Sequence, residues 1–269
     1  MNKLIIKQRL ALGIFFTLIT INAISAEQKH LVIYGATGQV GSHIMLEALA
    51  RGHKVTAVTR DLKRIKEKFK IDGPVADNFF PVQSDVTDLD LVNKTISGAD
   101  VVVVAVGYSG SPDNDPAKTV QNIAANNLIA AARKLGDSAP RIIQFTGTSS
   151  LRIGDKYLHE MGPQQESSGL GTKAHANSYG HILALETYLS VSDVEWTVFT
   201  ASRTGGKSRG VRTGNFQTNL GLLNITVDKS KKFKTFDYIR PLSWEDLGVA
   251  IINEIENPQY PKKQFTAHY

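Results

Sequence analysis

The sequence predicts a single α/β domain built on a doubly wound parallel sheet, and three observations support this fold class. Segments with strand and helix patterns alternate along most of the chain, which favours parallel strands joined by right-handed crossovers. The first predicted strand ends in a glycine-rich turn that opens directly into a helix. Residues 100–107 (Asp-Val-Val-Val-Val-Ala-Val-Gly) carry an uninterrupted apolar run, as expected for a central strand buried on both faces.

The other predicted strands are short apolar segments bounded by polar or charged residues. The first is His30-Leu-Val-Ile-Tyr34, and the last is Gln264-Phe-Thr-Ala-His268. Between these two we expect strands at residues 54–60, 79–85, 100–107, 141–146 and 195–200.

The predicted helices follow from the helical spacing of apolar residues and from capping signals. The first helix has its apolar residues on one face, and Gly52 is placed to end it. A long helix at about residues 117–135 repeats this pattern and stops at Gly136. The capping box Ser243-Trp-Glu-Asp246 opens a helix that runs through Ile255. Shorter helices are expected at residues 61–70, 88–97 and 178–190.

The first 26 residues have the layout of a secretory signal peptide. Basic residues at positions 3, 7 and 9 precede an apolar run, and small residues close the segment as Ala23-Ile-Ser-Ala26. We therefore expect a leader at 1–26, an exported (periplasmic or secreted) domain at 27–269, and no stable membrane span after cleavage. An uncut leader would anchor the domain outside the membrane. A leader without function would leave the protein in the cytoplasm.

Composition excludes several classes of function. Removing the leader takes three basic residues from a formal net charge of +6, and the remaining chain of about 243 residues suffices for one α/β domain. Because the residual charge is small and no basic run is interleaved with aromatic residues, we expect no nucleic-acid partner. The chain has no cysteine, which excludes disulfides, a thiol nucleophile and cysteine-ligated metals. We expect no metal site.

A nucleotide-binding turn follows the first strand, because three glycines spaced by three residues separate that strand from a helix. The first glycine permits the tight turn, the second lets backbone N–H groups approach a pyrophosphate, and the third lets the helix pack closely on the strand. A tight turn without any ligand is the alternative. The residues of this turn that we expect to bind a cofactor are Gly35, Ala36, Thr37, Gly38, Gln39 and Val40.

With these elements placed, the chain resembles the atypical short-chain dehydrogenase/reductase superfamily, in particular its NmrA-like, NAD(P)H-binding Rossmann branch. The resemblance covers nearly all of residues 31–269. It rests on the glycine turn and on Val58-Thr-Arg60 after the second strand. It is supported by three further segments: Ser84-Asp-Val-Thr-Asp88, Leu128-Ile-Ala-Ala-Ala-Arg-Lys-Leu-Gly136 and Ile239-Arg-Pro-Leu-Ser-Trp-Glu-Asp-Leu-Gly248. The resemblance implies a Rossmann-like fold and a nicotinamide cofactor.

The residue that ends the second strand favours NADP over NAD. An acidic residue there would bind the adenosine ribose hydroxyls of NAD, whereas Arg60 can pair bidentately with a 2′-phosphate. The resemblance further implies that Asp85 meets the adenine amino group with Val86 beside it, and that Val106 and Gly107 lie against the adenosine and nicotinamide side. Alternatively, Arg60 is an ordinary surface residue and Asp85 belongs to a turn or cap.

The catalytic residues depart from the pattern of the superfamily. Active members often use a Tyr-x-x-x-Lys pair, in which the lysine lowers the tyrosine pKa so that the hydroxyl can exchange a proton with substrate. No tyrosine in this chain has a lysine four residues later. The resemblance puts Asn177 at the tyrosine position and His181 at the lysine position, with Tyr179 nearby. His181 then contacts the nicotinamide ribose, shuttles protons, or is a polar residue that faces the cleft.

Three further segments bear on substrate. Thr146 is a candidate for a substrate-facing hydroxyl, or part of a hydroxyl-rich turn. Residues 150–176 contain four glycines and are expected to form a mobile lid. Residues 202–215 are expected to favour an anionic substrate or to form a solvated basic loop. The basic residues of this last segment are Arg203, Lys207, Arg209 and Arg212.

Three functions are compatible with these observations. The first is an NADP-dependent reductase or isomerase of a small carbonyl compound whose identity the sequence does not give. The second is a dinucleotide-binding sensor of the NmrA type that contacts a protein partner without turnover. The third is an exported scaffold without cofactor, against which the intact glycine turn and Arg60 count. Export and a nicotinamide cofactor are in tension, because NADP(H) is mainly an intracellular pool.

Overall fold

An eight-stranded sheet forms the centre of the protein. The computed structural model describes residues 27–107, 111–161, 171–201, 212–223 and 240–269, so the expected leader lies outside the described residues. The strand order is β3-β2-β1-β4-β5-β8-β10-β9, and every neighbouring pair is parallel except β10 with β9. The strands are β1 (His30–Tyr34), β2 (Lys54–Thr59), β3 (Phe79–Gln83), β4 (Val101–Val104), β5 (Arg141–Thr146), β8 (Trp196–Thr200), β9 (Gln217–Leu220) and β10 (Gln264–His268).

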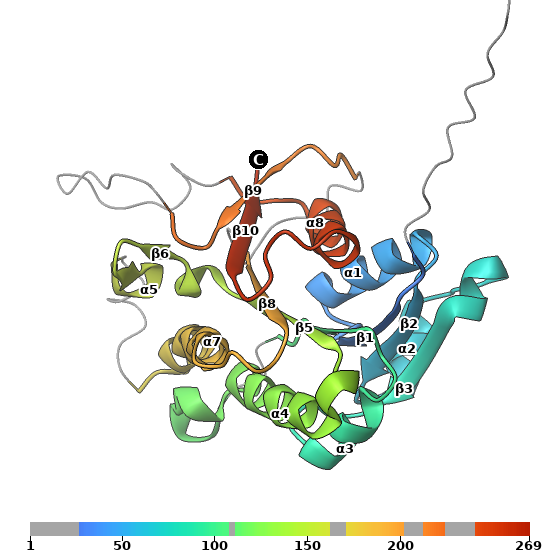
Figure 1. Cartoon of the computed structure of the whole chain (residues 1–269), viewed down its shortest axis with the longest axis horizontal. Coiled ribbons are helices and arrows are strands. Elements are labelled where there is room, and N and C mark those ends of the chain that lie inside the picture. Colours follow the sequence, from blue (N-terminus) through green and yellow to red (C-terminus); the bar gives the residue numbers. More distant parts are fainter. Residues whose placement is uncertain (1–26, 108–110, 162–170, 202–211, 224–239) are drawn as a thin grey trace, which may run out of the picture.

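Helices cover both faces of the sheet, as Figure 1 shows. On one face lie α1 (Gln39–Ala50), α2 (Leu62–Lys68) and α8 (Trp244–Glu256), and on the other lie α3 (Leu89–Thr95), α4 (Val120–Leu135) and α7 (Lys173–Leu189). A short hairpin of β6 (Arg152–Ile153) and β7 (Lys156–Tyr157) leads into α5 (Leu158–Met161). Short 3₁₀ helices are η1 (Gly73–Asn78), η2 (Pro112–Asn114), η3 (Pro116–Lys118), η4 (Gly136–Ser138) and η5 (Thr148–Ser150).

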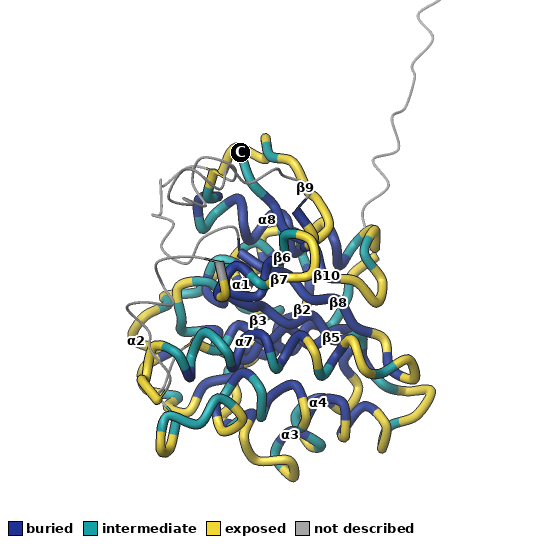
Figure 2. The backbone as a smooth tube through the Cα atoms, turned by 90° about the vertical axis from the view of Figure 1, so that its left-hand side faces the viewer, coloured by how far each residue is buried: buried dark blue, intermediate teal, exposed yellow. Residues whose placement is uncertain are grey.

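The sheet separates two hydrophobic cores, because successive side chains of a strand point to opposite faces. Leu31 and Ile33 of β1 pack with α1 and α8, whereas Val32 and Tyr34 pack with α3, α4 and α7. Val101–Val104 of β4 are all buried, which explains the unbroken apolar run. Figure 2 shows the central strands as the most continuously buried part of the chain.

The doubly wound parallel fold is confirmed, and the differences from the prediction lie at edges and helix ends. Strand β9 was not expected, because its residues Gln-Thr-Asn-Leu are all exposed and lack an alternating pattern. Helix α7 begins five residues before the predicted start at 178, since the Thr172 hydroxyl caps it by accepting the backbone N–H of His175. Helix α4 begins at Val120 rather than at 117, because η3 occupies residues 116–118.

The segment 150–176, predicted to form a mobile lid, contains regular structure at both of its ends. The first part contains β6, β7 and α5, and the last residues belong to α7. Leu151 and Leu158 pack with Leu223 in a small cluster of their own, which gives this segment regular structure. Residues 162–170 lie outside the described part, as do 202–211 of the second expected loop. None of the helices within the described ranges is long and apolar enough to cross a membrane.

We expect Gly248→Ala to loosen the contact between α8 and α1. A Cβ atom at this position would lie 2.8 Å from the carbonyl oxygen of His43, so the two helices must separate. Overpacking of this kind costs about 1–3 kcal/mol, and urea denaturation should show that loss in the free energy of unfolding. Gly107→Ala is the matched control, because its Cβ would meet no atom within 4 Å. Equal unfolding midpoints for wild type and Gly248→Ala would contradict this account.

Candidate functional site

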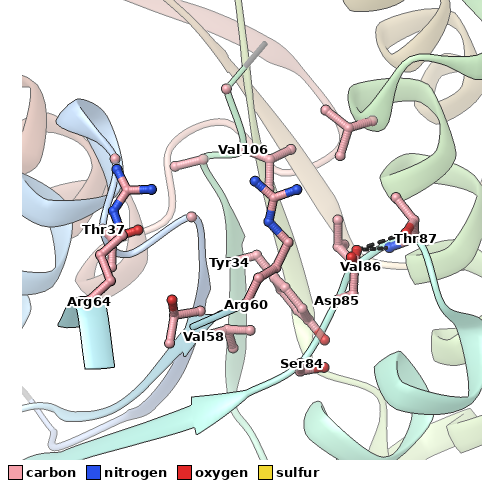
Figure 3. A pocket seen from close by; sticks show the side chains of 16 residues that line it. Tyr34, Thr37, Val58, Arg60, Arg64, Ser84, Asp85, Val86, Thr87 and Val106 are labelled. Atoms are coloured by element: carbon pink, nitrogen blue, oxygen red, sulfur yellow. Dashed lines mark hydrogen bonds between the residues drawn. The ribbon is translucent and has the colours of Figure 1, made fainter. Parts of the chain in front are cut away.

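A cleft opens at the carboxyl ends of β1, β2 and β4, where the strand order changes direction between β1 and β4. Ligands of doubly wound sheets bind at this switch point. The cleft has a volume of about 280 Å³ and is lined by the turn after β1, the end of β2 and residues 84–87 and 105–107. Figure 3 shows these side chains converging from separate segments.

The glycine turn is shaped by close approaches of the backbone. Gly35 has φ +80°, and a Cβ there would lie 2.4 Å from the carbonyl oxygen of Ala105 after β4. A Cβ at Gly41 would lie 2.2 Å from the carbonyl oxygen of Gly35. Both glycines are therefore required by the protein's own packing. Gly38 lines the cleft, and its nearest contact would be a looser 3.1 Å, so its missing side chain leaves space for a ligand.

The N-terminus of α1 is built to receive an anion. Its cap is Gly38, which provides no side-chain hydrogen bond, and no acidic residue lies in the first turn. Side chains cap α2, α3, α7 and α8, whereas α4, like α1, lacks a side-chain cap but does not begin at the glycine turn. The first N–H groups of a helix need a partner and carry the positive end of its dipole. A phosphate at the cleft would meet both requirements, and the residues present thus fit a dinucleotide.

Two arginines line the cleft where β2 ends and α2 begins. Arg60 directly follows β2, and Arg64 lies one turn into α2. In the part of the chain that the structure describes, neither guanidinium forms an ion pair. Figure 3 shows both side chains in the cleft wall. Sequence reasoning missed Arg64, although its spacing of four residues from Arg60 was a usable signal. Other lining residues not expected from the sequence include Thr59, Ser84 and Thr87.

The remaining predicted cofactor residues divide into two groups. Thr37, Asp85, Val86, Val106 and Gly107 line the cleft. Ala36, Gln39 and Val40 do not, since Ala36 is fully buried, Val40 packs against the core and Gln39 begins α1.

One oxygen of Asp85 has an internal role. Its Oδ1 accepts hydrogen bonds from the backbone N–H of Thr87 at 2.9 Å and from the Thr87 hydroxyl at 2.8 Å. The carboxylate thus stabilises the turn after β3 while its residue lines the cleft.

His181 lies under the carboxyl end of β5. Its ring contacts the backbone of Gly147, where an added Cβ would be 3.1 Å from the ring. Its Nε2 is 3.5 Å from the side-chain nitrogen of Gln121, which also donates to Asn177 at 3.1 Å. Burial lowers the pKa of His181 to about 4, so the ring is neutral near pH 7. The structure thereby brings Asn177 and His181 to one face of α7.

Tyr179 and Thr146 lie elsewhere. Tyr179 stacks on His175 with ring centres 5.5 Å apart. The Nδ1 of His175 lies 3.2 Å from the Nε2 of His159 in α5. The Thr146 hydroxyl is fully buried, 2.6 Å from the Thr200 hydroxyl and 2.9 Å from that of Ser150. Thr146 therefore joins β5, β8 and η5 rather than facing the cleft.

The described part of the basic loop is tied to the helices of one face. Arg212 pairs with Glu47 of α1 at 2.7 Å, which neutralises the only basic residue of that loop within the described ranges.

Asp246 accepts hydrogen bonds from the backbone N–H groups of Thr213 and Gly214, both at 2.8 Å, and from the hydroxyl of Tyr269 at 2.7 Å. Burial alone would raise the pKa of Asp246, but these hydrogen bonds outweigh it and hold the pKa below its usual value. The described residues contain no group of three potential metal ligands.

Comparisons with known proteins agree with this geometry. A family model described as NAD(P)H-binding matches residues 35–226. The uncharacterized protein YwnB of Bacillus subtilis is 26% identical over 87% of this chain and 95% of its own length. A Burkholderia pseudomallei protein proposed to be exported is 27% identical, with a TM-score of 0.64 over 90% of this chain and all of that one. A Bacteroides thetaiotaomicron protein proposed to be an epimerase is 28% identical, with a TM-score of 0.66 over 90% of this chain and 98% of that one.

We expect Asp246→Asn to lower the free energy of unfolding at pH 7 by about 1–3 kcal/mol, because an amide cannot accept all the hydrogen bonds that the carboxylate accepts. The pKa of Asp246 is lower in the folded state than its ordinary value of 3.8. The wild-type advantage is therefore complete above that value and disappears as the pH falls through the folded-state pKa.

Urea denaturation at neutral and strongly acidic pH measures this difference. Asp137→Asn, at an exposed site, should be neutral at both. A difference between wild type and Asp246→Asn that does not change with pH would refute the electrostatic explanation.

Proposed function

Because the chain belongs to the NAD(P)H-binding family, we propose that it is an NADP(H)-dependent reductase or isomerase of a small carbonyl compound. One observation carries the choice of NADP: Arg60 and Arg64 both line the cleft at the end of β2 and have no carboxylate partner among the described residues. Two such guanidinium groups match the charge and geometry of a 2′-phosphate.

Each part of the cleft has a definite task in this proposal. The uncapped N-terminus of α1 binds the pyrophosphate, and the space at Gly38 lets the backbone approach it. Asp85 and the turn after β3 border the adenine, while Val106 and Gly107 border the cofactor further along the cleft. When bound, the nicotinamide supplies or accepts a hydride. The protein has to position the acceptor carbon, exclude water and provide any proton that the reaction needs.

The proton source differs from a Tyr-x-x-x-Lys pair. A lysine would place a cation beside the hydroxyl that donates the proton, whereas His181 is buried and neutral near pH 7. Asn177, at the tyrosine position, has no acidic proton. We therefore propose that a carbonyl substrate takes its proton from water rather than from a lysine-activated hydroxyl.

The absence of a lysine-activated hydroxyl favours a second function, an NADP(H) sensor of the NmrA type that contacts a protein partner. The two functions differ in turnover. Mixing the purified protein with NADPH and a panel of small aldehydes, ketones and quinones, and following absorbance at the reduced nicotinamide band, should show substrate-dependent oxidation for a reductase. Tight NADPH binding without oxidation across the panel would favour the sensor.

We expect wild type to bind NADPH more tightly than NADH, and expect Arg60→Ala and Arg64→Ala each to remove much of this preference. Loss of one charge-assisted pair should weaken NADPH binding by about 1–3 kcal/mol, with little change for NADH, which lacks the 2′-phosphate. Titration calorimetry with both dinucleotides measures the two affinities.

Gly38→Val is the control that locates the ligand. A branched side chain in the space at the turn should abolish binding of both dinucleotides while thermal unfolding remains cooperative. Equal wild-type affinities for NADPH and NADH, or retained NADPH binding in Gly38→Val, would argue against this site.

We further propose that the protein is exported, on the basis of the residues before Glu27. The basic start, the short apolar core and the small residues should give a mature N-terminus at Ala26 or Glu27. Cell fractionation followed by N-terminal sequencing tests this directly. A cytoplasmic protein that retains Met1 would disprove export.

A further inference from the structure

A lysine of α2 contacts the glycine turn from outside. Lys68 is the last residue of α2, and its Nζ donates a hydrogen bond of 2.7 Å to the backbone carbonyl of Thr37. Thr37 belongs to the turn that lines the cleft. This bond links two segments 31 residues apart in sequence, and it fixes the end of α2 beside the place where a pyrophosphate would bind.

The charge of Lys68 is not compensated by an acidic neighbour. No carboxylate within the described ranges pairs with it, and its Nζ lies 5.1 Å from the ring centre of Phe69. Phe69 itself packs against a hydrophobic core, which orients the end of the helix. Partial burial and the positive charge of Arg64 lower the pKa of Lys68. An anion in the cleft would relieve this repulsion between two cations.

We propose that Lys68 is a positioning residue for the pyrophosphate, because it holds the glycine turn through the Thr37 carbonyl, while Arg60 and Arg64 serve the 2′-phosphate. The division follows from position, since Lys68 contacts the turn itself and Arg60 follows β2. It rests on the proposed dinucleotide function. Pyrophosphate is common to NADP(H) and NAD(H), whereas the 2′-phosphate belongs to NADP(H) alone. The three cations thus have separable effects on the two cofactors.

The test compares Lys68→Met with wild type in calorimetric titrations with NADPH and NADH at low ionic strength, where charge effects are least screened. We expect both affinities to fall by a similar factor, about fivefold to thirtyfold for the loss of one charged contact, so that their ratio is preserved. Lys68→Arg should recover part of the binding. The matched control is Lys63→Met, because Lys63 lies on the same helix, 82% exposed and paired with Glu67.

Measuring the affinity for NADH as a function of pH distinguishes a role of the Lys68 charge in cofactor binding from a purely structural role. Wild-type affinity for NADH should weaken at alkaline pH as Lys68 loses its proton, and this decline should be smaller in Lys68→Met, whose thermal stability should match that of wild type. Unchanged affinities in Lys68→Met, or a loss confined to NADPH, would overturn the assignment while leaving the proposed function intact. Failure of wild type to bind either dinucleotide would overturn both.

Discussion

The close approach of three backbone segments at Gly35 is the constraint on which the site depends. The carbonyl of Ala105 and the backbone of Gly41 lie so near to Gly35 that side chains would collide. The turn after β1 is therefore clamped between β4 and the first turn of α1. That clamp places the start of α1 at the switch point of the sheet, with its N–H groups facing the cleft. A rigid anion site follows from packing alone, before any charged side chain is considered.

Charges at the cleft are arranged differently from the ion pairs that connect elements elsewhere in the described chain. Arg51 pairs with Glu47 and Glu256, and the buried Glu254 is paired with Arg141. These pairs connect elements and satisfy buried groups. At the cleft, Arg60 and Arg64 have no acidic partner among the described residues. Next to the glycine turn, partial burial and then the positive charge of Arg64 lower the pKa of Lys68. Repulsion between like charges costs stability, and it persists at sites where a ligand of opposite charge relieves it.

The sequence was sufficient for the features that depend on local pattern. The alternation of strands and helices, the glycine turn and the Ser243 cap of α8 all have short-range signals, and the Ser243 hydroxyl accepts the N–H of Asp246 as expected. In a complete capping box the Asp246 carboxylate would accept the backbone N–H of Ser243. Here it accepts hydrogen bonds from Thr213, Gly214 and Tyr269 instead. Such contacts join segments far apart in sequence, so no local pattern reveals them. Lys68 was missed for the same reason: it resembles any surface lysine until α2 is placed beside Thr37.

The two halves of the predicted site have diverged in different ways from the pattern of the superfamily. The half proposed to hold the dinucleotide has the glycine turn together with Arg60 and Arg64. The half expected to handle protons has His181 at the position that the resemblance assigns to a lysine. Burial keeps this ring neutral, and its Nδ1 is buried with no hydrogen-bond partner in the described structure. A neutral ring there cannot stabilise a tyrosinate by charge. Within the proposed function, such a site fits a reaction in which the protein assists hydride transfer, while the acceptor takes its proton from water.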